Sequence, residues 1–162
     1  MADLLADGNI KATWVPSIAD VSAPTIAELT DGTAVDLECL ILLGGLDIKA
    51  ETGSVDNSAL CSTDDTEEPG RNAFTIMLTC KRKDTAEEDT AWNTLTFRAL
   101  GNLVVRRDRA AADAYAADQP VEVYPARCGL PMMLEPEKNS VQKFQVKLFN
   151  NSTADTRATV AA

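Results

Sequence analysis

Apolar and polar side chains alternate through two segments of the chain, residues 73–83 and 141–149. Successive side chains of a β-strand point to opposite faces, so this period of two is typical of a strand with one buried face and one exposed face. The apolar positions of the two segments are Phe74, Ile76, Leu78, Cys80, Phe144, Val146 and Leu148. Both segments are therefore predicted to be strands of an antiparallel sheet.

Shorter runs with similar character predict more strands. These runs are residues 34–43, 102–107, 121–124, 132–134 and 156–160. They are separated by turn signals such as Gly44-Gly45 and Asn150-Asn151 and not by regularly spaced helices. This arrangement favours an antiparallel β-sandwich or barrel over a doubly wound parallel sheet.

One helix is predicted between Thr90 and Gly101, because apolar residues recur there at helical spacing. They are Trp92, Leu95, Ala99 and Leu100. Thr90 can cap the start of this helix, and Gly101 can end it. The Ala-rich residues 108–118 fit either a short helix or a loop. The expectation is a mainly β single domain over residues 1–162 with one flanking α-helix.

The first 30 residues have no sustained helical or strand period, and Pro16 and Pro24 interrupt them. Proline fixes its own φ and restricts the preceding residue to extended conformations. Residues 1–30 are therefore predicted to be an extended N-terminal arm that grips neighbouring molecules.

Residues 51–70 contain six acids and no base, and Pro69-Gly70 closes them. A loop of this length is usually functional or disordered. We expect a long acidic loop that, like the arm, contacts neighbouring molecules. The candidate contact residues of the two segments are Trp14, Pro16, Pro24, Glu51, Asp64, Asp65, Glu67 and Glu68.

Charge excludes some partners. The 162 residues carry a formal net charge of −10, with 25 acids against 15 bases. A nucleic-acid-binding surface needs clustered Lys and Arg to neutralise phosphates, so this acidic balance argues against such a surface. Adhesion to an anionic membrane is disfavoured for the same reason. The N-terminus lacks the pattern of a secretory signal, so the chain is expected to stay in the cytosol or to leave it by a route other than general secretion.

The residues for most catalytic chemistry are missing. The chain has no histidine, no C-x-x-C pair, no G-x-S-x-G elbow and no Gly-rich phosphate loop. We predict neither catalytic residues nor a cofactor or metal. Cys39 and Cys80 are expected to be buried thiols, and Cys61 to be exposed. Asp64-Asp65-Thr66-Glu67-Glu68 lacks the spacing of a calcium loop and is expected to be solvated.

Two predicted strands carry a polar face opposite an apolar one. The polar residues are Asp36, Glu38, Lys143, Gln145 and Lys147. An ordinary half-exposed antiparallel sheet explains this pattern. The alternative is that this polar face lines a channel between copies of the chain.

Three blocks of sequence carry a resemblance to a known family. The first is Asp7-Gly8-Asn9-Ile10-Lys11 through Trp14-Val15-Pro16, Ala23-Pro24-Thr25 and Asp36-Leu37. The others are residues 92–107, and Val123-Tyr124-Pro125 followed by Cys128-Gly129, Pro131 and residues 143–149. In this order they resemble phage tail tube proteins, the major tail subunits, particularly those of long-tailed phages of actinobacteria.

The resemblance implies the tail tube fold, two packed sheets flanked by a helix, in subunits joined as hexameric rings. It implies a structural virion protein whose stacked rings form a conduit for DNA ejection. The implied partners are other copies of the chain and the tape measure, tail terminator and distal tail proteins. DNA would pass without specific binding.

Other functions stay open at this level. One group is structural, namely the inner tube of a contractile tail or injection system, or a capsid decoration protein. The other is a small acidic hydrolase or calcium-binding module, since 25 acids allow many chance carboxylate pairs.

Overall fold

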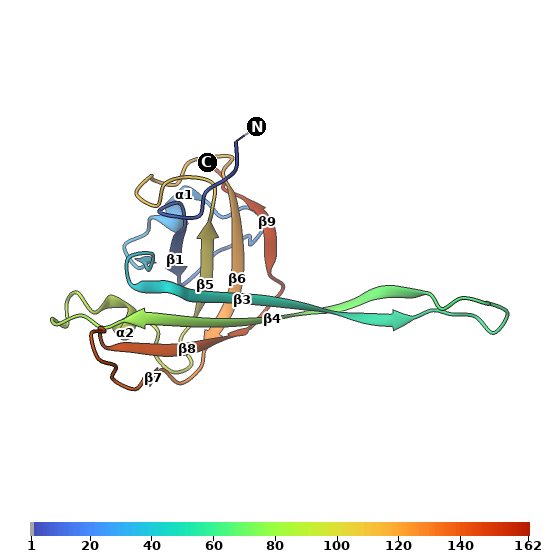
Figure 1. Cartoon of the computed structure of the whole chain (residues 1–162). Coiled ribbons are helices and arrows are strands. Elements are labelled where there is room, and N and C mark those ends of the chain that lie inside the picture. The colour runs from blue at the N-terminus through green and yellow to red at the C-terminus, as the bar shows by residue number, and fades with distance from the viewer. Residues whose placement is uncertain (1) are drawn as a thin grey trace.

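The computed structural model describes residues 2–162, which form short helices around antiparallel strands (Figure 1). The strands are β1 (Lys11–Val15), β2 (Val35–Asp36), β3 (Ile41–Asp56), β4 (Glu67–Lys81), β5 (Leu100–Arg106), β6 (Pro120–Cys128), β7 (Met132–Met133), β8 (Lys143–Asn150) and β9 (Asp155–Thr159). The helices are α1 (Ile26–Leu29) and α2 (Thr90–Thr94). The predicted mainly β, antiparallel fold class is confirmed.

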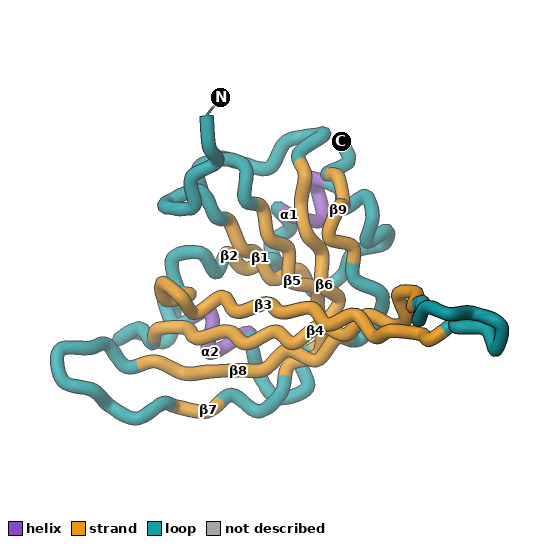
Figure 2. Tube along the Cα trace, turned by 45° about the vertical axis from the view of Figure 1, so that its right-hand side comes forward, coloured by secondary structure: helices purple, strands orange, loops and turns teal. Residues whose placement is uncertain are grey.

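The strands form two layers that cross each other (Figure 2). We call β3, β4, β8 and β7 the hairpin layer, and β2, β1, β5, β6 and β9 the β1 layer. β6 connects them, because it pairs with β5 and β9 and its last residues also pair with β8. The hydrogen-bonded sheet is thus continuous and folds over onto itself.

Apolar side chains of the two layers meet in the main core. The hairpin layer contributes Ile76, Leu78, Phe144, Val146 and Leu148, and the β1 layer contributes Trp14, Leu103, Val105, Tyr124 and Ala126. The fit around Trp14 is close, since a Cβ at Gly101 would lie 2.6 Å from its indole ring. A second cluster on the other face of the β1 layer includes Val15, Leu29, Val104, Val123 and Val160.

The predicted N-terminal arm is wrong for much of residues 1–30. All five residues of β1 are buried between β2 and β5, and Trp14 is 2% exposed. Thr25 and Glu28 form a capping box that starts α1, whose Leu29 is buried. The sequence signal was weak because the alternation of Lys11 and Thr13 with Ala12 and Trp14 spans only five residues and Pro16 follows at once.

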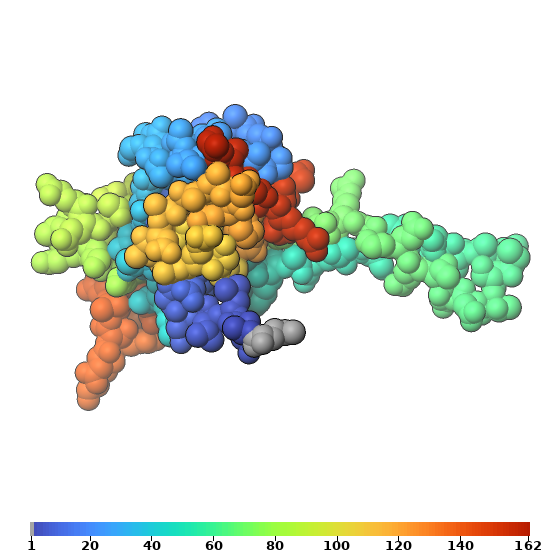
Figure 3. Space-filling view, turned by 90° about the horizontal axis from the view of Figure 1, so that it is seen from above, coloured from blue at the N-terminus to red at the C-terminus, as the bar shows by residue number. Residues whose placement is uncertain are grey.

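The predicted acidic loop is also wrong in part, because half of residues 51–70 belong to strands. β3 and β4 stay paired out to Asp56 and Glu67, so the connecting segment is only residues 57–66. The resulting two-stranded ribbon stands clear of the body (Figure 3). Backbone pairing needs no apolar side chains, which explains why a polar sequence concealed two strands.

The flanking helix is shorter than predicted. α2 ends at Thr94, and Leu100 opens β5 by pairing with Arg127. Arg98 has a φ of 66°, a left-handed conformation that no helix continues through. Residues 108–118, for which a helix or a loop was expected, form a loop.

Candidate assembly interface

The outer part of the hairpin, residues 50–73, is almost wholly exposed, and we call it the hairpin extension. Its Val55 side chain is 52% exposed and that of Leu60 is fully exposed. An isolated two-stranded ribbon is at best marginally stable in water. Exposed apolar side chains on such a ribbon therefore indicate that it packs against another molecule.

The charges of the hairpin extension point the same way. Asp56 and Glu67 lie directly opposite each other across the two strands, an arrangement of like charges that destabilises the pair. The pKa of Asp56 is lowered by its hydrogen bonds with Ser58, whose backbone N–H donates at 2.8 Å, so this carboxylate stays ionised. A cation from elsewhere would relieve the repulsion.

The opposite side of the hairpin layer from the core is a second candidate surface. It carries Lys143, Gln145 and Lys147 of β8, and Thr79 and Met77 of β4 face the same side by register. Lys143 is neutralised by Glu137 at 3.2 Å, whereas Lys147 lies 5.0 Å from the ring of Phe149. The free edge of β3, which pairs with β4 alone among the described strands, borders this surface.

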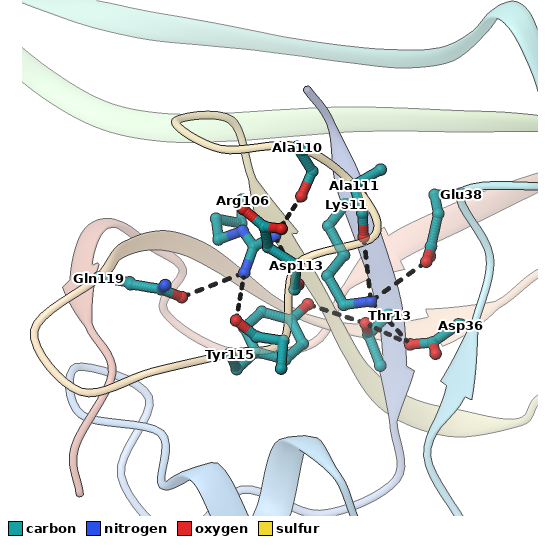
Figure 4. Close-up of polar contacts among 11 residues, drawn as sticks. Lys11, Thr13, Asp36, Glu38, Arg106, Ala110, Ala111, Asp113, Tyr115 and Gln119 are labelled. Atoms are coloured by element: carbon teal, nitrogen blue, oxygen red, sulfur yellow. Dashed lines mark hydrogen bonds and ion pairs between the residues drawn. The ribbon is translucent and has the colours of Figure 1, made fainter. Parts of the chain in front are cut away.

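A polar cluster lies on the far face of the β1 layer (Figure 4). The Lys11 ammonium donates to Glu38 at 3.2 Å and lies 3.7 Å from Asp36. The Thr13 hydroxyl donates to Asp36 at 3.1 Å and is 2.8 Å from the Tyr115 hydroxyl. Burial raises the pKa of Tyr115 to about 12, so its hydroxyl stays protonated. These contacts join β1, β2 and the loop after β5.

Arg106 organises that loop. Its side chain is fully buried, and its guanidinium donates to the carbonyls of Ala110, Asp113 and Ala114 at 2.8, 2.9 and 3.0 Å. A fourth bond goes to the amide oxygen of Gln119 at 3.1 Å. Three backbone carbonyls with no strand partner are thereby satisfied by one side chain. Figure 4 shows the loop wrapped around it.

The structure separates the sequence-predicted channel residues. Lys143, Gln145 and Lys147 face outward from the hairpin layer, whereas Asp36 and Glu38 belong to the polar cluster behind the β1 layer. The two groups thus lie on different sides of one subunit. Strand alternation predicts which side chains share a face of one strand, but it does not predict on which side of the subunit that face lies.

The predicted contact residues are also divided. Trp14 and Pro24 are buried within the subunit and have no surface to offer a neighbour. The exposed members are Pro16, Glu51, Asp64, Asp65, Glu67 and Glu68. All but Pro16 lie on the hairpin extension. The sequence did not predict the length of the hairpin extension, the free β3 edge or the role of Arg106. A single buried arginine within a strand has no periodic pattern that would reveal it.

Two of the four cysteines are expected to react readily with Ellman's reagent in the unassembled protein. Cys39 and Cys61 are exposed, and the expected burial of Cys39 is therefore wrong. Cys80 and Cys128 are buried, which raises the pKa of each thiol to about 12 and keeps both protonated at pH 8. Absorbance should report two fast thiols in buffer and four after unfolding in urea. Four fast thiols in buffer would contradict the packing of β4 and β6.

No helix among residues 2–162 is both long enough and apolar enough to span a membrane. No group of three or more His, Cys, Asp or Glu side chains in that part of the chain could hold a metal ion.

Comparison with known proteins gives a family and a similar fold. The model of the family described as "Phage tail tube protein" matches residues 1–162. A chain in the cryo-EM structure of the anti-feeding prophage baseplate, 6-fold symmetrised, has a similar fold, with a TM-score of 0.57 and 8% identity over 96% of each chain. No curated protein matches the sequence. The family match extends over the whole sequence, and the chain belongs to the phage tail tube protein family.

Proposed function

We propose that this protein is the structural subunit of a phage tail tube, in which stacked rings of identical copies enclose a conduit for DNA ejection. The observation that carries the proposal is the hairpin extension, whose apolar and acidic side chains are left exposed by the rest of residues 2–162. It performs no catalysis, and its place is the virion. Its other partners are the tape measure, tail terminator and distal tail proteins.

The free edge of β3 supports ring closure. An exposed strand of 16 residues is a template for pairing with another chain, and a ring of copies removes that edge. Six copies per ring is the number we propose, given the similar fold in an assembly imaged with six-fold symmetry. The inner tube of a contractile tail or injection system is a second candidate, since the similar fold occurs in a prophage baseplate.

The outer face of the hairpin layer is proposed to line the conduit. It is a broad sheet face left uncovered within residues 2–162, and it includes Lys143 and Gln145, whereas Lys147 lies at its end beside Phe149. Asp36 and Glu38 are assigned instead to internal pairing with Lys11. Lys143 is already neutralised by Glu137, and the net charge of −10 disfavours adhesion of DNA phosphates, so the genome passes without a specific site.

Electron microscopy of the purified protein tests this function. We expect soluble monomers at low concentration and hollow tubes with an axial ring repeat at high concentration or with tail-initiator proteins. The physical reason is that the heterologous contacts of a stacked ring extend into an open filament. Monomers under every condition, initiator proteins included, would contradict the proposal.

A further inference from the structure

We propose that the hairpin extension of one subunit docks on a basic–apolar patch of a neighbouring copy, formed by Arg98, Leu100, Arg127, Lys147 and Phe149. This inference rests on the proposed function and deepens it by naming the receiving surface. The occupant to which we commit is a second copy of this chain.

The patch is built by three adjacent strands. Leu100 of β5 lies directly opposite Arg127 of β6, which lies directly opposite Phe149 of β8, so the three side chains share one face. Leu100 is 51% exposed and Phe149 is 53% exposed. A Cβ at Gly129 would lie 3.0 Å from the Phe149 ring, so the glycine leaves the space that this ring occupies.

The cations of the patch lack acidic partners. Among the described residues, no carboxylate lies within ion-pair distance of Arg98, Arg127 or Lys147. Arg98 lies 5.2 Å from the Phe97 ring and Lys147 lies 5.0 Å from the Phe149 ring. A chain with ten more acids than bases thus keeps three unpaired cations beside exposed apolar side chains.

The hairpin extension has the complementary composition. It combines exposed Val55 and Leu60 with six acids and no base from residue 51 to residue 70. The opposed Asp56 and Glu67 need a cation, and the patch supplies cations. Such complementarity sets the register and choice of partner. The donor and acceptor surfaces are different, so the contact is heterologous, as a ring or filament requires.

An apolar groove beside Cys39 is the competing receptor. It has a volume of about 520 Å³ and is lined mainly by apolar residues such as Ile10, Ile41 and Leu42. Its charged lining residues are Asp7, Glu38 and Arg107, and Arg107 is already bonded to Glu122 at 2.6 Å. Glu38 is likewise paired, with Lys11 at 3.2 Å, so the groove offers an acidic ribbon no free cation and we favour the patch.

The size of the contact explains why it needs many copies. At about 3.3 Å per residue, residues 51–60 reach at most roughly 30 Å, and a two-stranded ribbon is about 10 Å wide. One face therefore covers roughly 300 Å², well below the area of a stable pairwise complex. Docking becomes stable only where each subunit both gives and receives a hairpin.

Charge reversal tests the pairing. The acceptor variant R98E/R127E and the donor variant E67K/E68K should each raise the critical concentration for tube formation about tenfold or more. The variant with all four changes should return to within about threefold of the wild type, because opposite charges face each other again. The matched control K83E/R157E changes two exposed cations outside the patch and should assemble normally. Sedimentation measures assembly, and circular dichroism confirms folding.

The outcomes separate this inference from the proposed function. Wild-type protein that never forms tubes overturns the function, whereas tubes that form normally from R98E/R127E and E67K/E68K overturn only the docking site. Failure of the folded four-change variant to recover also overturns it.

Cross-linking provides a second test. In tubes of V55C/L100C/C61S, oxidation should join Cys residues at positions 55 and 100 of different copies, identified by peptide mass spectrometry. A link from position 55 to Cys39 would place the hairpin in the competing groove and overturn the inference, as would no link at all.

Discussion

Replacing Arg106 with methionine should lower the free energy of unfolding by about 3–5 kcal/mol, as loss of one partner in a buried polar network does. Methionine keeps most of the apolar volume but donates no hydrogen bond. The carbonyls of Asp113 and Ala114 would lose their donor, whereas the Ala110 carbonyl keeps the Asp113 N–H and the Gln119 amide oxygen keeps the Ala116 N–H. Each buried acceptor left unpaired costs about 1–3 kcal/mol, less where the loop opens to water. Urea unfolding followed by tryptophan fluorescence measures the change.

Arg109 offers a matched control in the same loop. Its side chain is 56% exposed and its nearest acid is Asp108 at 3.8 Å, so R109M should change stability by less than about 0.5 kcal/mol. A loss in R106M as small as that in R109M would show that the loop holds its shape without the buried guanidinium.

Shortening the hairpin should abolish tubes and leave the subunit folded. Replacing residues 52–72 with Asn-Gly would join Glu51 to Ala73, which are already cross-strand partners, through a favoured two-residue turn. The deleted residues are almost all exposed, so the core loses nothing. We expect the melting temperature to change by no more than a few degrees, while electron microscopy shows no tubes.

A full-length variant that lacks four acidic side chains serves as the control for this deletion. A full-length variant with E67S, E68S, D64S and D65S keeps the ribbon but removes four of its charges, and should weaken assembly without abolishing folding. Tubes of normal length from the shortened protein would remove the hairpin from any role in assembly. A lower melting temperature by tens of degrees would instead mean that the ribbon supports its own subunit.

Alternation made the half-buried strands predictable. Residues 73–83 and 141–149 each show one apolar face, and the structure buries Ile76, Leu78 and Val146 as their period of two requires. β1 has the same alternation, with Ala12 and Trp14 in the main core and Lys11 and Thr13 in the polar cluster. It escaped detection because the alternation spans only five residues and Pro16 follows at once.

The candidate surfaces were harder to predict. The acids of the extension were evident from the sequence, but its two strands are held by backbone bonds that leave no trace in side-chain polarity. The patch joins Leu100, Arg127 and Phe149 across three strands, and only the register brings them together. Long-range pairing of this kind is a property of the topology, which local sequence does not encode.

A hairpin that leaves the body on one side and a receiving face on another give any resulting polymer a direction. At one end of the polymer the hairpin extension of the terminal copy has no patch to bind, and at the other end the patch of the terminal copy has no hairpin bound. The two ends are chemically unlike, so a protein that starts growth and a protein that stops it must recognise different shapes. The polarity of the tail would then be determined by the two different surfaces of each subunit before the first ring closes.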